Sequence, residues 1–384
     1  MRLCLISSSF YPATNYGGPI SSTWNLSKRI AAKNLKVFVS TTNANGRDKL
    51  DVETNKFIFI SDNFFIKYYN EQIINKLSLN FIFGIWDDIK RSDIIYIQYL
   101  FHYTAFFALI FSLIHKKKII ICPRGSFSSY TLKNRFVFLK NILLNFIGIF
   151  NRKIIWHASS YLEKNDIISR FSKAEVRTVN DGVDFNSFQK FERINRIDLI
   201  KKYTNIRFAK VSHVFFSMGR LHAIKRFDVL INAFSIFVKS HKDAKLIIAG
   251  GNDGVEEELR LQIIKMNLEE NLFLINHINF IDKNIILNNC DYFTLCSEFE
   301  SFGIVIAEAI SCGKPVIISN KTPWIDIEDN NCGYFVENNP NDICIAFEKI
   351  INFKSKPELI KKYARDNFDW KRISQIFINT FKIS

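Results

Sequence analysis

The stretch from Tyr292 to Ile317 constrains the fold of this chain more than any other. An apolar run, Tyr292 to Cys296, predicts a buried parallel strand, and a polar loop follows it. Gly303 then opens a short apolar helix that ends near Gly313, and Pro315 begins the next strand. This succession is typical of an open α/β sheet, in which ligands bind at the carboxyl ends of the strands.

Two glutamates stand in this stretch, eight residues apart. Glu300 lies in the loop and Glu308 lies two turns into the helix, so they can reach different parts of one elongated ligand. The alternative is that both are solvated surface charges. The helix around Glu308 is otherwise apolar, and a carboxylate in such a setting needs a partner. The first amides of the same helix can bind a phosphate.

The residues ESFGIVIAEA, followed by CGKPV, resemble the Glu-x7-Glu signature of glycosyltransferase family four. The resemblance extends over nearly the whole chain and is closest from Phe215 to Ile318. It implies an α/β protein of the GT-B fold, with two Rossmann-like domains facing a central cleft and a C-terminal helix crossing back to the first domain. It also implies a retaining, nucleotide-sugar-dependent enzyme.

The resemblance assigns roles within the same stretch. It implies that Glu308 hydrogen-bonds the ribose of the donor nucleotide and that Glu300 contacts the donor sugar. It places the backbone after Glu300 near the sugar or phosphate, at Phe302, Gly303 and Ile304. The loop that cradles the nucleobase then contains His277 and Ile278.

A pair of cations lies in another strand-to-helix loop. Arg220 and Lys225 follow a strand predicted at residues 214–218, so both can converge on a diphosphate. Solvated surface charges are the alternative. The resemblance implies that the pair neutralises charge on the leaving nucleoside diphosphate, a large electrostatic contribution to catalysis.

The first half of the chain begins with a strand, a loop and a helix. Gly17 and Gly18 lie in the loop, where a backbone can approach a ligand closely, although a plain tight turn has the same signature. The resemblance places this loop near the donor phosphates and the acceptor.

Three positions in the first half depart from the family pattern. Many relatives carry a histidine near Gln98, and the family usually has an asparagine where Asp181 stands. Relatives often carry a histidine where Arg124 stands, but one subgroup associated with polysaccharide assembly has Pro-Arg-Gly, as here. His102 is a partial substitute for the first, or a pocket-wall residue. Arg124 cannot act as a general base, so we expect it to bind an anion; a surface turn arginine is the alternative. Gln98, His102 and Arg124 form the predicted acceptor side.

Residues 131–150 combine basic and apolar side chains in a pattern that predicts one helix. Two interpretations stay open. The helix lies in a membrane interface, or it turns one face to the core and the other to water.

Composition adds limits on partners and compartment. The chain has 384 residues with 52 Lys and Arg against 37 Asp and Glu, a net charge of +15 that favours an anionic partner. The seven cysteines form no Cys-x-x-Cys pair, which indicates reduced thiols. We expect a cytoplasmic protein, with peripheral contact at the inner face of the membrane as a further expectation.

The predictions combine into one enzyme. We expect an acceptor domain at residues 1–185, a donor domain at 186–366 and a C-terminal helix at 367–384 that packs on the first domain. The predicted activity is hexosyl transfer from a nucleotide sugar to a glycan, lipid-linked and destined for bacterial surface polysaccharide. The predicted catalytic residues are Glu300, Arg220, Lys225 and Arg124, with no metal or other cofactor.

Two other classes of protein are alternatives to this prediction. One is a GT-B nucleotide-sugar epimerase. The other is a non-catalytic basic protein that binds a membrane or nucleic acid. Scattered lysines and phenylalanines in core-like runs argue against nucleic acid.

Overall fold

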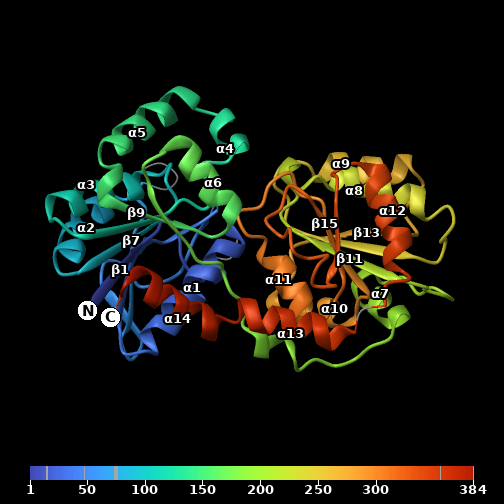
Figure 1. Ribbon diagram of the computed structural model, residues 1–384. Coiled ribbons are helices and arrows are strands. Elements are labelled where there is room, and N and C mark those ends of the chain that lie inside the picture. Colours follow the sequence, from blue (N-terminus) through green and yellow to red (C-terminus); the bar gives the residue numbers. More distant parts are fainter. Residues whose placement is uncertain (14–15, 47, 73–76, 355, 384) are drawn as a thin grey trace. The chain divides into compact units, whose positions relative to one another are not determined.

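The computed structural model describes residues 1–13, 16–46, 48–72, 77–354 and 356–383. The chain folds as two compact units (Figure 1). Unit 1 contains Met1–Gly182 together with the chain from Trp370 onward, and unit 2 contains Val183–Asp369. The domain boundaries predicted from the sequence lie between residues 185 and 186 and between residues 366 and 367. The chain therefore passes between the units twice.

Unit 1 is built on an eight-stranded sheet. Its strands are β1 (Arg2–Ile6), β2 (Lys36–Thr42), β5 (Phe57–Ser61), β6 (Phe64–Tyr69), β7 (Ile94–Gln98), β8 (Lys118–Cys122), β9 (Ile154–Ala158) and β10 (Glu175–Thr178). The order is β10-β9-β8-β7-β1-β2-β6-β5, parallel except for β5 at the edge. A separate two-stranded ribbon joins β3 (Ala44–Asn45) to β4 (Asp48–Lys49).

Helices cover both faces of this sheet. They are α1 (Gly18–Ala31), α2 (Leu79–Lys90), α3 (Tyr103–Ile114), α4 (Ser129–Lys133), α5 (Val137–Ile149), α6 (Tyr161–Arg170) and α14 (Trp370–Phe381), with a short 3-10 turn η2 (Asn151–Lys153). One apolar core lies between the sheet and α1 with α14 (Figure 1). A second core lies on the other face, under α2, α3, α5 and α6.

The C-terminal helix returns to the first unit, as the resemblance implies. Its start differs from the prediction, because Phe368 ends the preceding helix in unit 2 and α14 begins at Trp370. Phe377 of α14 lies against Tyr96, with ring centroids 5.3 Å apart, and the helix packs beside α1.

The single helix predicted at residues 131–150 is wrong. The structure has two helices, α4 and α5, separated at Arg135 and Phe136. These residues have φ angles of 40° and 53°, in the left-handed region, which a continuous right-handed helix cannot contain. Lys140 holds the corner by donating to the carbonyls of Thr131 at 2.6 Å and Asn134 at 2.5 Å.

Unit 2 is built on a six-stranded, fully parallel sheet. Its strands are β11 (Val214–Met218), β12 (Lys245–Ala249), β13 (Leu272–Ile275), β14 (Tyr292–Leu295), β15 (Val316–Ser319) and β16 (Gly333–Val336). The order is β13-β12-β11-β14-β15-β16, so the strand order reverses between β11 and β14. In open α/β sheets, ligands bind at the carboxyl ends of the strands at this position.

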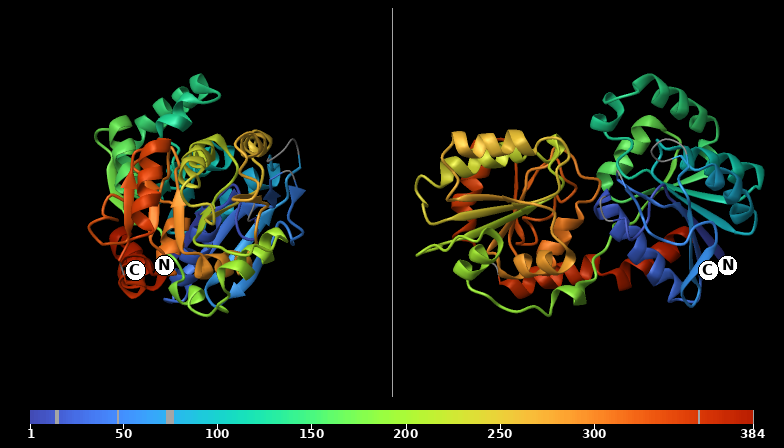
Figure 2. Two further views of the ribbon diagram at one scale, coloured as in Figure 1. Left: turned by 90° about the vertical axis from the view of Figure 1, so that its right-hand side faces the viewer. Right: turned by 180° about the vertical axis from the view of Figure 1, so that it is seen from behind.

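Helices also cover both faces of the second sheet. They are α7 (Arg196–Thr204), α8 (Phe227–Phe237), α9 (Glu256–Lys265), α10 (Phe280–Asn289), α11 (Ile304–Ser311), α12 (Pro340–Ile350) and α13 (Pro357–Phe368), with 3-10 turns η3 (Phe185–Phe188) and η4 (Ala223–Lys225). Figure 2 shows α8, α9 and α12 on one face and α7, α10, α11 and α13 on the other. Among the described residues, no helix is long and apolar enough to cross a membrane.

Candidate functional site

The two loops at the centre of the second sheet meet each other. The loop after β11 contains Arg220 and Lys225, and the loop after β14 contains Glu300. The amide of Glu298 donates to the carbonyl of Ile224 at 2.8 Å, which joins the two loops through their backbones. The charged residues predicted from two distant motifs therefore occupy one end of the sheet.

Lys225 and Glu300 form an ion pair across these loops. The Lys225 Nζ lies 2.5 Å from Glu300 Oε1, and both side chains are largely buried. The Ser297 hydroxyl donates to the same oxygen at 2.7 Å. Because both contacts use Oε1, the carboxylate keeps Oε2 for another donor such as a sugar hydroxyl.

Arg220 lies on the outer side of the same loop. Its Nη1 pairs with Asp253 Oδ2, and the side chain is about half exposed. Asp253 follows β12 and was not predicted. A guanidinium carries five N–H donors, so Arg220 retains donors that face solvent and can bind an anion.

Gly303 shapes the start of α11. Its φ of 84° lies in the left-handed region that favours glycine, and a Cβ there would come within 3.0 Å of Ile306 Cδ1. Ile304 begins the helix, and its amide and that of Val305 have no partner within the helix, whereas the Ile306 amide donates to the Gly303 carbonyl at 2.9 Å. The Phe302 side chain is buried beside Trp324, so Phe302 offers only its backbone to a ligand.

Glu308 has a partner, as its apolar helix predicts. Its Oε1 lies 2.5 Å from the Lys283 Nζ of α10, and both side chains are mostly buried. Its other oxygen, Oε2, is buried without a hydrogen-bond partner among the described residues. An unpaired buried acceptor is costly, so this oxygen is suited to a ligand hydroxyl.

The residues predicted around the nucleobase lie after β13. His277 is exposed and Ile278 is half-buried. The loop after β12 lies alongside, because a Cβ on Gly251 would stand 3.8 Å from the His277 Cβ. Both loops are therefore at the same end of the sheet as Arg220.

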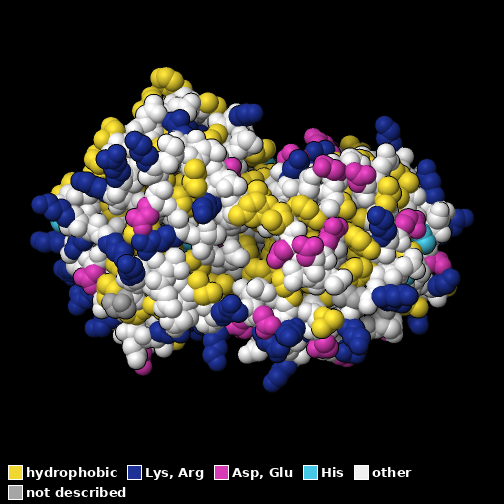
Figure 3. All heavy atoms as spheres, viewed as in Figure 1, with side chains coloured by type: hydrophobic (Ala, Val, Ile, Leu, Met, Phe, Trp, Pro, Cys, Tyr) yellow, Lys and Arg dark blue, Asp and Glu magenta, His cyan; other side chains and the backbone are white. Residues whose placement is uncertain are grey.

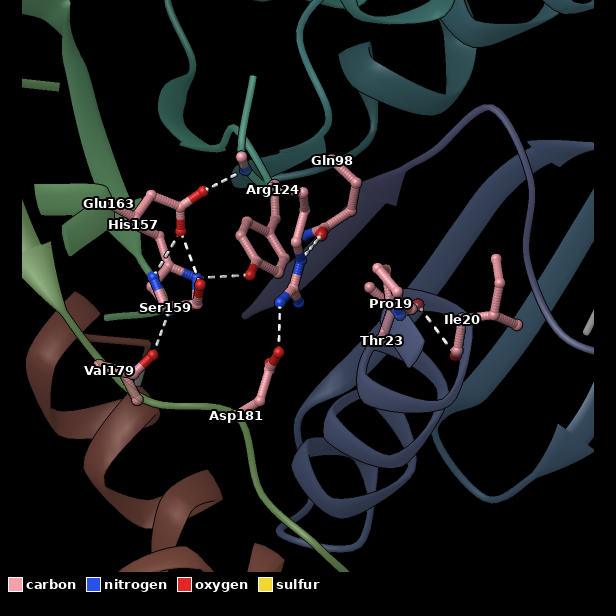
Figure 4. Close-up of polar contacts among 12 residues, drawn as sticks. Pro19, Ile20, Thr23, Gln98, Arg124, His157, Ser159, Glu163, Val179 and Asp181 are labelled. Carbon is pink, nitrogen blue, oxygen red and sulfur yellow. Dashed lines mark hydrogen bonds and ion pairs between the residues drawn. The ribbon is translucent and has the colours of Figure 1, made fainter. Parts of the chain in front are cut away.

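In unit 1, Gln98 and Asp181 both contact Arg124 (Figure 4). Arg124 Nη1 lies 2.6 Å from Asp181 Oδ2, and its Nε donates to Gln98 Oε1 at 2.9 Å. The Arg124 side chain is 1% exposed, so the surface-turn alternative is wrong. Burial lowers the pKa of Arg124, but the Asp181 carboxylate outweighs it and keeps that pKa well above its ordinary value. Its Nη2 is buried without a partner among the described residues.

Glu163 holds the backbone of this cluster. Its carboxylate accepts from the Gly125 amide at 2.6 Å and from the Ser159 amide and hydroxyl, each at 2.7 Å. Burial raises the pKa of Glu163, and these bonds partly oppose that effect. Ser160 caps α6 by accepting from the Glu163 amide, and the Glu163 carboxylate fixes the Arg124–Gly125 turn. Nothing in the sequence indicates that Glu163 contacts this turn.

The other predicted residues of unit 1 lie at helix starts. Gly17 is the N-cap of α1 with a φ of 79°, and Gly18 is its first residue. Figure 4 includes this first turn, where the Thr23 hydroxyl donates to the Pro19 carbonyl at 2.8 Å. His102 is the N-cap of α3, and its Nδ1 contacts the Thr104 hydroxyl at 2.9 Å.

Metal ligands do not cluster in the part of the chain that the structure describes. No group of three or more His, Cys, Asp or Glu residues there could hold a metal ion. The seven cysteines are free thiols, and burial raises the pKa of each.

Sequence comparison identifies the second unit. Residues 203–367 match the family described as glycosyl transferases group 1. An alpha-1,3/1,6-mannosyltransferase of Dictyostelium discoideum is 31% identical over 182 residues, which are 42% of this chain and 43% of that protein. An Escherichia coli UDP-Gal:alpha-D-GlcNAc-diphosphoundecaprenol alpha-1,3-galactosyltransferase is 28% identical over 47% of this chain and 48% of that protein. Each match spans less than half of the relative.

Structural comparison covers the whole chain. Anabaena HepE in complex with UDP and glucose superposes with a TM-score of 0.76 at 18% identity, over 100% of this chain and 99% of that one. That likeness establishes the fold. The chain thus has the GT-B fold of two Rossmann-like units, and its residues 203–367 match the glycosyl transferases group 1 family.

Proposed function

We propose that this protein is a retaining glycosyltransferase that moves a hexose from a nucleotide sugar to a glycan acceptor. The observation that carries the proposal is the Lys225–Glu300 pair, which joins the two loops at the reversal of strand order in unit 2. A cation and a carboxylate there suit a ligand with a diphosphate next to a sugar. The family of residues 203–367 supports the same assignment.

The donor site follows from the charges of unit 2. Arg220 and Lys225 neutralise the diphosphate, and the free amides at the start of α11 add further donors. Glu308 Oε2 accepts from a ribose hydroxyl, which satisfies its unpaired oxygen. Glu300 accepts from a hydroxyl of the sugar through Oε2. His277 and Ile278 line the place of the base.

The chemical step needs no protein nucleophile. The bond between the anomeric carbon and the diphosphate oxygen breaks, and the diphosphate leaves with the electron pair. The acceptor hydroxyl forms its bond from the same face, and its proton passes to the departing phosphate oxygen. Arg220 and Lys225 stabilise the charge that develops on the leaving group, so we propose that no metal is required.

Arg124 is the proposed contact on the acceptor side. Asp181 pairs with Arg124 Nη1, and the buried Nη2 keeps donors for a hydroxyl or a phosphate of the acceptor. We propose that Gln98 and His102 belong to the same side of the site, and that the Gly17–Gly18 backbone approaches the ligand.

The acceptor is proposed to be a lipid-linked glycan at the cytoplasmic face of a bacterial membrane. One matched relative is named for a diphosphoundecaprenol-linked acceptor. A product of that kind belongs to surface polysaccharide synthesis, either lipopolysaccharide or capsule. Such an acceptor requires the enzyme to contact the membrane peripherally.

Turnover tests the proposal. The purified protein is incubated with UDP-, GDP- and dTDP-hexoses, with undecaprenyl-diphosphate-linked N-acetylglucosamine as the acceptor probe, and with EDTA throughout. We expect acceptor-dependent release of nucleoside diphosphate from one donor and an α-linkage by NMR. Lys225→Ala should lose at least about 100-fold in rate, whereas the exposed Lys239→Ala should not.

Three outcomes would overturn the proposal or part of it. An equal rate in Lys225→Ala would remove the assigned role of the cation. A β-linked product would exclude retention. Conversion of the nucleotide sugar to its epimer without transfer would favour the epimerase alternative.

A further inference from the structure

The outer surface of α4 and α5 carries a concentration of exposed apolar side chains. Phe136 is 74% exposed, Phe138 76%, Leu139 60%, Ile142 51% and Ile149 75%. Side chains of this size are normally found singly on a soluble surface, and a contiguous group marks an interaction site. Figure 3 shows apolar side chains projecting from this part of unit 1, with Lys and Arg side chains beside them.

Helix α5 is apolar on two faces. Its inner face packs on unit 1 through the buried Leu144 and Ile147, with half-buried neighbours at 140, 143 and 146. Its outer face follows the same helical spacing, with Phe138, Ile142 and Ile149 at intervals of four and seven. A surface helix that needs only one apolar face therefore has a second one without a partner.

The corner before α5 presents the end of this surface. Arg135 and Phe136 both have left-handed φ angles, which are unusual for a bulky side chain. Such strain persists where surrounding contacts determine it, and here the Lys140 ammonium fixes the corner from inside. The result is that Phe136 points into solvent at the tip.

The charged residues that flank α5 in the sequence are all cations. Lys133 and Arg135 precede α5, Arg152 and Lys153 follow it, and all four are exposed. The sequence contains no Asp or Glu between Asp93 and Glu163. Arg170 of α6 adds a cation at the side of the helix, where it donates to Asn145 at 2.7 Å. This distribution complements an anionic surface.

We infer that α4 and α5 form a docking surface for an anionic lipid bilayer. Helix α5 lies in the plane of the interface, with Phe136, Phe138, Leu139, Ile142 and Ile149 among the headgroups and upper acyl chains. The four flanking cations bind the lipid phosphates. The inference rests on the proposed function for its purpose, because a lipid-linked acceptor lies at the membrane, but its physical basis is the surface alone.

Vesicle binding tests the inference without any turnover. Full-length protein is sedimented with sucrose-loaded vesicles of phosphatidylethanolamine and phosphatidylglycerol, and with vesicles of phosphatidylcholine alone. We expect at least about tenfold tighter partition to the anionic vesicles, weakened by salt. The double variant Phe138→Gln/Ile142→Gln should lose about tenfold or more, because both side chains are exposed and lose insertion rather than core packing.

The control makes the same change elsewhere. Leu261 and Ile264 of α9 are 62% and 56% exposed, so Leu261→Gln/Ile264→Gln removes equivalent surface from unit 2 and should bind vesicles like wild type. A charge variant, Arg135→Gln/Arg152→Gln/Lys153→Gln, should lose the preference for anionic lipid.

Two results would overturn the inference. Equal partition of wild type and Phe138→Gln/Ile142→Gln is one. A self-association by light scattering that this variant abolishes, with no vesicle binding by wild type, would instead assign the surface to a second copy of the chain. Because donor turnover is measured separately, failure here removes the proposed membrane contact but leaves the glycosyl transfer standing, and failure of turnover leaves vesicle binding unchanged.

Discussion

Arg124 Nη1 lies 2.6 Å from Asp181 Oδ2, although 57 residues separate the two in the chain. Each was noted in the sequence as a departure from the pattern that the resemblance implies. Gln98, the third departure, accepts a hydrogen bond from the same guanidinium. The three residues therefore form one physical unit, a buried ion pair with its hydrogen-bond acceptor.

Breaking that pair should be more damaging than replacing it. Asp181→Asn leaves a buried guanidinium without its counter-charge, and we expect a loss of about 3 kcal/mol or more in the free energy of unfolding. The double variant Arg124→His/Asp181→Asn removes both charges and should recover a large part of that loss. Chemical denaturation of the two single variants and the double variant measures the coupling.

A partly exposed ion pair in the same unit serves as the control for the double-mutant cycle of Arg124 and Asp181. Arg177→His/Glu175→Gln removes a partly exposed ion pair from β10 of the same unit and should show little coupling. Additive effects of the Arg124 and Asp181 substitutions would contradict the account.

His157 should make unit 1 less stable in acid. Burial, together with the nearby Arg124 charge, lowers the pKa of His157 to about 4. Its Nε2 must donate to the Val179 carbonyl at 2.8 Å, so its Nδ1 accepts from the Tyr96 hydroxyl at 2.6 Å. Between pH 6.5 and 4 the unfolded chain binds a proton that the folded chain does not, so stability falls as pH falls through this window.

The test compares wild type with His157→Gln by thermal unfolding at pH 7 and pH 5. Acidification should lower the free energy of unfolding of wild type by about 2 kcal/mol more than that of the variant. The figure follows because one unit of pKa difference corresponds to about 1.36 kcal/mol. An identical acid dependence in both proteins would show that His157 does not titrate as described.

Two adjacent glycines should respond differently to the same substitution. A Cβ on Gly250 would stand 1.9 Å from the backbone oxygen of Gly219, the residue before Arg220. A Cβ on Gly251 would make only an ordinary contact of 3.8 Å with the His277 Cβ. Gly250→Ala should therefore shift the Arg220 loop and weaken UDP binding by about tenfold, with a loss of roughly 2 kcal/mol in stability.

Gly251→Ala is the control and should keep both properties near wild type. Calorimetric titration with UDP and thermal unfolding of the two variants give the comparison. Equal behaviour of the two would show that the Gly219–Gly250 contact does not position the cation loop.

Lys283 should support donor binding through Glu308. Removing the ammonium in Lys283→Met leaves a mostly buried carboxylate without its counter-charge next to the proposed ribose position. We expect a larger KM for the donor with little change in kcat, and weaker binding of UDP. A fall in kcat alone, with the donor KM unchanged, would contradict this role.

The sequence predicts the local part of the site well. The run from β14 to α11 was identifiable because an apolar strand, a polar loop and a glycine at each end of the helix are neighbours in the chain. The partner of Glu308 was not, because Lys283 lies 25 residues earlier on another helix. The same holds for Arg124 and Asp181: each was noted as unusual, but only the fold brings them together.

Elements without local signals account for the remaining differences. The break between α4 and α5 occurs at Asn134-Arg135-Phe136, with neither glycine nor proline, so the apolar period appeared continuous. The edge hairpin of β5 and β6 was not predicted, although Asp62-Asn63 separates two aromatic-rich runs, which is a hairpin signal. In the structure, Asn63 has the left-handed φ angle that suits such a turn.

Thermal stabilisation by nucleotides tests the central claim, a donor site in unit 2, most directly. Wild type, Lys225→Ala, Glu308→Ala and the control Lys239→Ala are melted with UDP-, GDP-, ADP-, CMP- and dTDP-sugars without added metal. The account predicts a shift with one nucleotide class in wild type and Lys239→Ala, worth about 2.7 kcal/mol at a ligand concentration 100 times Kd, and its loss in the other two variants. No shift with any nucleotide, or an undiminished shift in both Lys225→Ala and Glu308→Ala, would contradict it.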